Sequence, residues 1–138
     1  MDDDVLINKA ATVERCVARA REEYAKNPDT FATDFTRQDA AILNLQRACQ
    51  ASLDMGQHVV RMRKLGIPQR YQDVFTFLEQ AQLIDQPLSD SMKRMCGFRN
   101  IAVHEYQKVQ LPITVAIIKH DLDDFTTFTR TLPPLPPH

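Results

Sequence analysis

Glycine is scarce in this chain: only three occur among 138 residues, and tryptophan is absent. Glycine-rich phosphate loops, dinucleotide-binding fingerprints and glycine-punctuated β-sandwiches are therefore poorly supported. No Cys-x-x-Cys pair and no His-x-x-x-His spacing occurs, so the sequence predicts no metal site. These shortages exclude several common ways of recruiting a cofactor, and any chemistry is expected to come from the chain's own side chains.

Long apolar runs are also missing, since no stretch of about twenty apolar residues could cross a bilayer. The chain opens with Met1-Asp2-Asp3-Asp4, which carries the wrong charge for a secretory signal. We therefore expect a cytoplasmic protein with no membrane contact. Cysteines 16, 49 and 96 are widely spaced and odd in number, which favours three buried, reduced thiols.

The charge is unevenly distributed over the chain, although the net charge is only −1. Residues 61–108 carry eight cations against five acids, which leaves −4 for the remainder. The cations are Arg61, Arg63, Lys64, Arg70, Lys93, Arg94, Arg99 and Lys108. A basic middle segment is compatible with one phosphate-binding cleft. Cations spread over solvent-exposed helix faces would give the same number of charges.

Apolar residues recur at steps of three and four, the spacing of amphipathic helices. This pattern predicts one helix over residues 4–26 and a longer one over 36–65, which Gly66-Ile67-Pro68 would end. A short helix is expected over 71–82. No strand pattern appears.

Two further helices complete the prediction. Ser89 is interpreted as the N-cap of a helix that continues through Arg99 toward His104, and Pro112 as the start of the last one. The last helix buries a stripe of apolar side chains at Ile118, Leu122, Phe125 and Leu132, with Phe128 one position off it. The fold class is therefore all-α: an antiparallel up-and-down bundle of four main helices plus a short one in residues 1–132, followed by a proline-rich, extended tail at 133–138.

The most informative segment is Gly97-Phe98-Arg99-Asn100-Ile101-Ala102-Val103-His104-Glu105-Tyr106. Three apolar residues anchor it in a core, while Arg99, His104 and Tyr106 cluster at a helix end where side chains can converge. An isolated Arg-x4-His spacing is common, and a helix end whose Arg and His meet solvent is the plain alternative.

This pattern resembles the HEPN superfamily of small helical proteins and, within it, the HepT-type toxins. Arg99, Asn100 and His104 match the HEPN signature, and Arg99, His104 and Tyr106 match every fixed position of the HepT form, Arg-x4-His-x-Tyr. The resemblance covers nearly the whole chain in helix order, excluding the tail. It implies a metal-independent endoribonuclease with Arg99 and His104 as catalytic residues, supported by Asn100 and Arg94.

The resemblance also implies partners. HEPN proteins form homodimers in which two motifs share one cleft, which would supply both an acid and a base for RNA cleavage. In the family, a nucleotidyltransferase antitoxin of the MntA type attaches AMP to the tyrosine at the position of Tyr106. No other cofactor is expected.

Weaker candidates and one different function remain open. His58 and His120 could line the cleft, although a surface or core histidine is the more ordinary role, and Asp121, Asp123 and Asp124 are interpreted as a solvated face. The alternative function is a non-catalytic helical adaptor that positions a nucleotidyltransferase or its nucleotide.

Overall fold

The structure is a computed structural model that describes residues 2–97 and 111–132, and the regular elements in this part of the chain are all helices. The helices are α1 (Asp2–Ala25), α2 (Phe35–Met62), α3 (Tyr71–Gln80), α4 (Gln86–Gly97), α6 (Leu111–Ala116) and α7 (Leu122–Thr131). A 3-10 turn at Phe31–Thr33 precedes α2, and a π-helical turn at Ile117–Asp121 joins α6 to α7. The all-α prediction is confirmed for the described residues.

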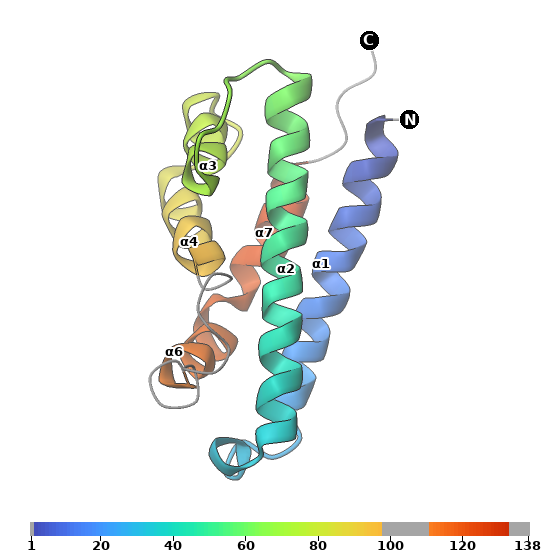
Figure 1. Cartoon of the computed structure of the whole chain (residues 1–138), viewed down its shortest axis with the longest axis vertical. Helices are drawn as coiled ribbons and strands as arrows, with labels where there is room; N and C mark the ends of the chain where they lie inside the picture. The colour runs from blue at the N-terminus through green and yellow to red at the C-terminus, as the bar shows by residue number, and fades with distance from the viewer. Residues whose placement is uncertain (1, 98–110, 133–138) are drawn as a thin grey trace.

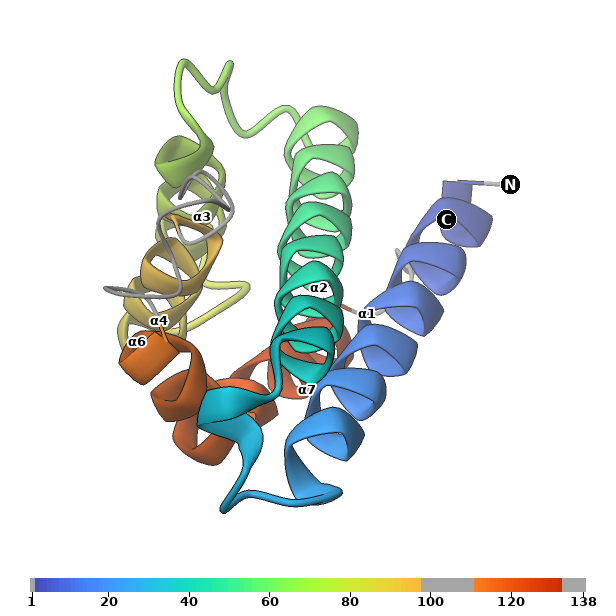
Figure 2. The same ribbon diagram turned by 60° about the horizontal axis from the view of Figure 1, so that its bottom comes forward.

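Helix α2 is the central element of the bundle. Figure 2 shows it between α1 on one side and α3 with α4 on the other, while α7 runs along the bundle behind it in Figure 1. Because it has neighbours on several sides, most of its middle turns are buried, including Leu53, Met55 and Val59. The predicted long helix is therefore the one around which the others pack (Figure 2).

The end of α2 differs from the prediction. The helix stops at Met62, and Lys64 adopts the left-handed conformation with φ 55°. The backbone amides of Lys64 and Leu65 donate to the carbonyls of Arg61 (3.2 Å) and Val60 (2.9 Å), which is the Schellman pattern. Gly66 also has a positive φ, 151°, which suits glycine. A Cβ there would lie 2.8 Å from the ring of Phe77, so only glycine lets this turn pack on α3.

The start of α4 also differs from the prediction. The helix begins at Gln86, and the Asp85 side chain accepts a hydrogen bond of 2.9 Å from the backbone amide of Leu88. Ser89 is not the N-cap: it is fully buried inside the helix and donates to the carbonyl of Phe75 at 3.4 Å. Aspartate thus supplies the cap one turn earlier, and the serine hydroxyl is used against α3.

The last helix begins near Pro112, as predicted, but it is not continuous. The π-helical turn at Ile117–Asp121 inserts an extra residue per turn, a feature that periodicity alone does not reveal. The apolar stripe is nevertheless buried as expected at Ile118, Leu122, Phe125, Phe128 and Leu132. The three cysteines are buried free thiols, which confirms that prediction. Residues 133–138 lie outside the described part of the chain.

Candidate functional site

The predicted motif lies between two well-defined anchors. Arg99, Asn100, His104 and Tyr106 all fall in residues 98–110, outside the described residues. The segment follows Gly97, the last described residue of α4, and precedes Leu111, the first residue of α6, so the predicted continuation of the helix toward His104 also lies outside the described residues. The contacts of α4 and of the α6–α7 region therefore determine where the motif is attached to the bundle.

The last turns of α4 are fixed to α2 by two buried cysteines. The Cys49 thiol donates to the carbonyl of Met95 (3.2 Å), and the Cys96 thiol donates to the carbonyl of Cys49 (3.7 Å). Thiols are weak donors, but here both lie in a dry contact between two helices. Cys96 is three residues before Arg99, so this contact fixes α4 close to the start of the motif.

Helix α3 holds the same end of α4 from another side. The hydroxyl of Tyr71, the first residue of α3, donates to the carbonyl of Lys93 at 3.2 Å. Gly97 lies directly against this phenol, because a Cβ there would be 2.7 Å from the Tyr71 oxygen. A side chain at position 97 would push the phenol away, so glycine is required for this close approach.

The π-helical turn and α7 form the third contact. Ser91, which is buried on α4, donates to the Asp124 carboxylate at 2.5 Å. Arg94 lies 4.0 Å from Asp121, the last residue of the π-helical turn. The prediction of a solvated aspartate face is therefore wrong for these two residues and holds for Asp123, which is 89% exposed and pairs with Arg21.

Of the residues predicted for the site, Arg94 is the one that lies in the described part of the chain. It is on the last turn of α4, and its side chain is 64% exposed. An exposed pair at 4.0 Å is a weak one, typically worth less than about 1 kcal/mol. The Arg94 guanidinium can therefore exchange Asp121 for a phosphate with only a small loss of free energy.

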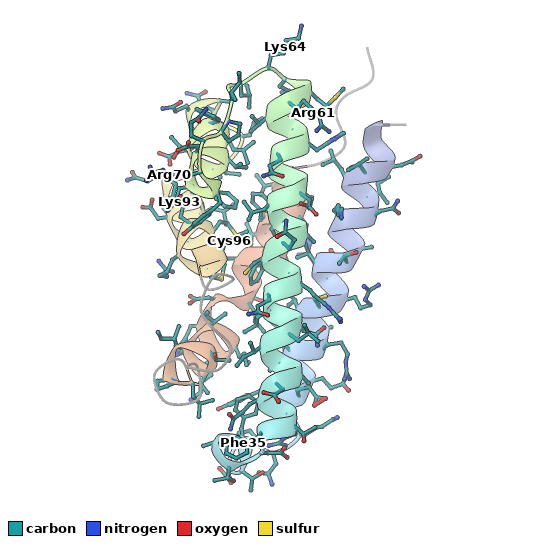
Figure 3. All side chains as sticks on the ribbon, in the orientation of Figure 1. Phe35, Arg61, Lys64, Arg70, Lys93 and Cys96 are labelled. Carbon is teal, nitrogen blue, oxygen red and sulfur yellow. The ribbon has the colours of Figure 1, made fainter. Side chains whose placement is uncertain are left out.

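Basic groups gather where α3 begins beside α4. The Asp73 carboxylate accepts hydrogen bonds from the backbone amides of Gln69 (2.8 Å) and Arg70 (3.1 Å), and these bonds hold the pKa of Asp73 below its usual value. The positive charges of Arg70 and Lys93 lower the pKa further, so both cations lie near this carboxylate. Figure 3 shows Arg70 and Lys93 close together on the α3–α4 side of the bundle.

The two other candidate histidines lie in different environments. His58 is buried on α2, where its Nδ1 lies 3.4 Å from the Arg61 guanidinium. His120 is exposed on the π-helical turn. His58 therefore occupies a core position and His120 a surface position, while the residues 98–110 that would form the cleft lie outside the described part of the chain.

Two kinds of site are missing from residues 2–97 and 111–132. No group of three or more His, Cys, Asp or Glu side chains is arranged to hold a metal ion there. Within the same ranges, no helix has the length and apolar character needed to span a membrane.

Comparison with known proteins decides the family. Residues 13–132 match the family described as Ribonuclease HepT-like. The chain belongs to this family. It is also 50% identical over 126 residues to the "mRNA nuclease HepT" of Shewanella oneidensis, covering 91% of this chain and 94% of that protein. The expected resemblance is therefore confirmed.

Solved structures agree with this assignment over 94% of the chain. A crystal structure of an MntA–HpeT toxin–antitoxin complex has a TM-score of 0.88 and 48% identity, with 97% of its chain covered. A structure of the tri-AMPylated Shewanella oneidensis HEPN toxin in complex with MNT antitoxin has a TM-score of 0.87 and 49% identity, with 96% of its chain covered. At this identity, the shared fold extends over nearly every described element.

Some residues that hold α4 in place could not be found from sequence. Tyr71, Cys49 and Ser91 are ordinary members of helical stripes, and nothing in their spacing marks them as contacts of α4. The pairing of Asp124 with Ser91 depends on the π-helical turn, which no sequence pattern indicated.

Proposed function

We propose that this chain is the ribonuclease toxin of a toxin–antitoxin pair and acts on RNA in the cytoplasm. The observation that carries the proposal is 50% identity over nearly the whole chain to a protein named mRNA nuclease HepT. The complete Arg-x4-His-x-Tyr motif at Arg99, His104 and Tyr106 supports it. Relatives solved as toxin–antitoxin complexes support the pairing with an antitoxin.

The proposed reaction uses the RNA's own 2′-hydroxyl as the nucleophile. His104 moves the proton: a base takes it from the 2′-oxygen, which bonds to the adjacent phosphorus, and an acid protonates the departing 5′-oxygen. The products are a 2′,3′-cyclic phosphate and a 5′-hydroxyl. Arg99 stabilises the extra negative charge on the five-coordinate phosphorus with its planar set of donors.

A homodimer would supply the acid and the base together. One chain offers one Arg99 and one His104, whereas two copies across a two-fold axis bring a pair of each to one cleft. Asn100 follows Arg99 directly and supports it in this proposal. Arg94 supplies an additional phosphate contact, consistent with its exposure and its weak pairing with Asp121.

The proposed switch is the addition of AMP to Tyr106 by a nucleotidyltransferase antitoxin. The phenol loses its proton to solvent, its oxygen bonds to the α-phosphorus of ATP, and the bond from that phosphorus to the β-phosphate breaks, so that pyrophosphate leaves. Each adenylate places a negative phosphodiester and a base two residues from His104, where it would pair with Arg99 and repel RNA. The tri-AMPylated state of the Shewanella toxin supports this modification.

The test is induced expression of the chain with and without its cognate nucleotidyltransferase, with growth, RNA integrity and intact protein mass measured together. We expect arrest and RNA cleavage from the chain alone, and mass increments of AMP with recovery when both are present. Tyr106→Phe should arrest growth and resist recovery. Normal growth with intact RNA would instead favour the non-catalytic adaptor.

A further inference from the structure

The turn from α2 to α3 concentrates positive charge. Residues 61–70 contain Arg61, Arg63, Lys64 and Arg70 and no acidic residue, in a chain whose net charge is −1. Within the described residues, no carboxylate lies within 4.0 Å of the charged groups of Arg61, Arg63 or Lys64. By contrast, Arg19 and Arg21 of α1, and Lys26 directly after that helix, each have a carboxylate partner.

A groove with a volume of about 580 Å³ lies between this turn and the end of α2. This volume is within the range of small-molecule sites, about 300–1,000 Å³. The apolar part of its lining consists of Val60, Ile67 and Pro68. The polar part, which can reach phosphates or base edges, consists of Gln57, Arg61 and Lys64.

Ile67 is the most exposed of the large apolar side chains in the described part of the chain, at 82%, and Phe35 follows at 57%. An apolar surface beside cations suits a nucleotide, because a base can lie on the apolar face while its phosphate meets the positive charge.

The groove is formed by a fixed backbone. Two Schellman hydrogen bonds set the path at Lys64 and Leu65, and Gly66 packs on the ring of Phe77. Pro68 further restricts the backbone here, because its ring fixes φ. A preformed groove loses little conformational entropy on binding, which favours a binding role.

Two further cations, Arg70 and Lys93, lie below this turn in Figure 3, on the side of α4. Arg70 closes the basic turn, and its charge and that of Lys93 both act on Asp73. Lys93 is on α4, six residues before Arg99 in the sequence. Figure 3 shows Lys64 and Arg61 at the upper end of the bundle and Arg70 and Lys93 lower down, nearer to Cys96.

We propose that this groove binds one nucleotide of the single-stranded RNA substrate, outside the link that is cut. The base lies against Ile67 and Pro68, and its phosphates meet Arg61 and Lys64. The strand then follows Arg70 and Lys93 to the segment that carries Arg99. This inference rests on the proposed ribonuclease function and adds a substrate-binding site to it.

The test is binding of a fluorescent single-stranded RNA of about twelve nucleotides to the full chain, titrated at several salt concentrations in a His104→Ala background that prevents cleavage. Lys64→Gln should raise Kd several-fold and reduce the salt slope of log K by about 0.7, the amount for one lost phosphate contact on a single strand. Gln82 already adopts φ 61° in this chain, so glutamine suits the left-handed backbone at position 64.

Ile67→Asn should raise Kd by about tenfold with the salt slope unchanged, because it removes a contact to the base and no charge. Arg47→Gln is the matched control. Arg47 is also exposed on α2, but its charge acts on Cys16 of α1, so its loss should change neither Kd nor slope.

Cleavage by the wild-type chain is measured in parallel. If the wild type cuts RNA but Lys64→Gln and Ile67→Asn both bind RNA as tightly as the parent, this inference is wrong and the proposed function stands. A wild type that does not cut RNA overturns the proposed function. Variants that keep RNA binding but escape modification by the antitoxin would assign the groove to the antitoxin and overturn the proposal.

Discussion

The hydroxyl of Tyr71 donates a hydrogen bond of 3.2 Å to the carbonyl of Lys93, so the first residue of α3 holds the last part of α4. Gly97 makes this approach possible, since the phenol oxygen occupies the space that a Cβ would need. The contact lies directly before the segment that carries Arg99. We therefore expect Tyr71 to act as a positioning residue through α4.

Tyr71→Phe should lower the rate of RNA cleavage at saturating RNA about three- to tenfold while leaving KM nearly unchanged. The loss of one neutral hydrogen bond lowers the free energy of unfolding by about 0.5–1.5 kcal/mol, which still leaves a folded protein. Steady-state cleavage kinetics and thermal unfolding measure the two effects. Tyr24→Phe is the control, since that ring packs on Phe31; an equal loss of rate in both variants would contradict the positioning role.

Gly97→Ala should reduce cleavage more strongly, because the new methyl group would lie 2.7 Å from the Tyr71 oxygen. The double variant Gly97→Ala/Tyr71→Phe should recover part of the loss, since the clashing oxygen is gone. A double-mutant cycle on cleavage rate and unfolding free energy measures this coupling. Strictly additive effects would show that the two residues do not act on each other.

The thiols of Cys16, Cys49 and Cys96 should resist alkylation in the native protein. All three are buried, and burial raises the pKa of Cys16 against the opposing charges of Arg15 and Arg47, so less reactive thiolate is present. Mass spectrometry after brief iodoacetamide treatment at about pH 8 should show an unmodified chain, and three additions after denaturation. Rapid native labelling of Cys96 would contradict the packing of α4 on α2.

Asp73→Asn should destabilise the chain in a pH-dependent way. Backbone amides of Gln69 and Arg70, followed by the charges of Arg70 and Lys93, lower the pKa of Asp73 from its usual 3.8. The carboxylate therefore contributes stability that is present above that pH and lost as the pH falls through the lowered pKa. The Tm difference between wild type and variant should be largest near neutral pH and shrink below about pH 4; a constant difference would contradict this.

The sequence was sufficient for the helical fold because burial follows simple periodicity in α1, α2 and the last helix. It failed where local polar contacts compete with that pattern. Asp85 rather than Ser89 caps α4, and Lys64 rather than Gly66 takes the left-handed position after α2. The π-helical turn was also missed, since its extra residue leaves the apolar stripe buried.

The candidate site was predicted from four residues in one short segment and from a family resemblance. That resemblance is confirmed by the match over residues 13–132. The contacts that hold α4 were not predictable, because each joins residues far apart in the sequence: Tyr71 with Lys93, Cys49 with Met95, and Ser91 with Asp124. The roles of Arg99, Asn100, His104 and Tyr106 stay predictions.

The most direct measurement is cleavage of a defined RNA by the purified chain in the presence of EDTA, with the ends of the products identified. We predict a 2′,3′-cyclic phosphate, no cutting where the 2′-hydroxyl is replaced by hydrogen, and loss of activity by at least about a hundredfold in Arg99→Ala or His104→Ala. Cleavage that EDTA abolishes, or that both variants retain, would contradict the proposed mechanism.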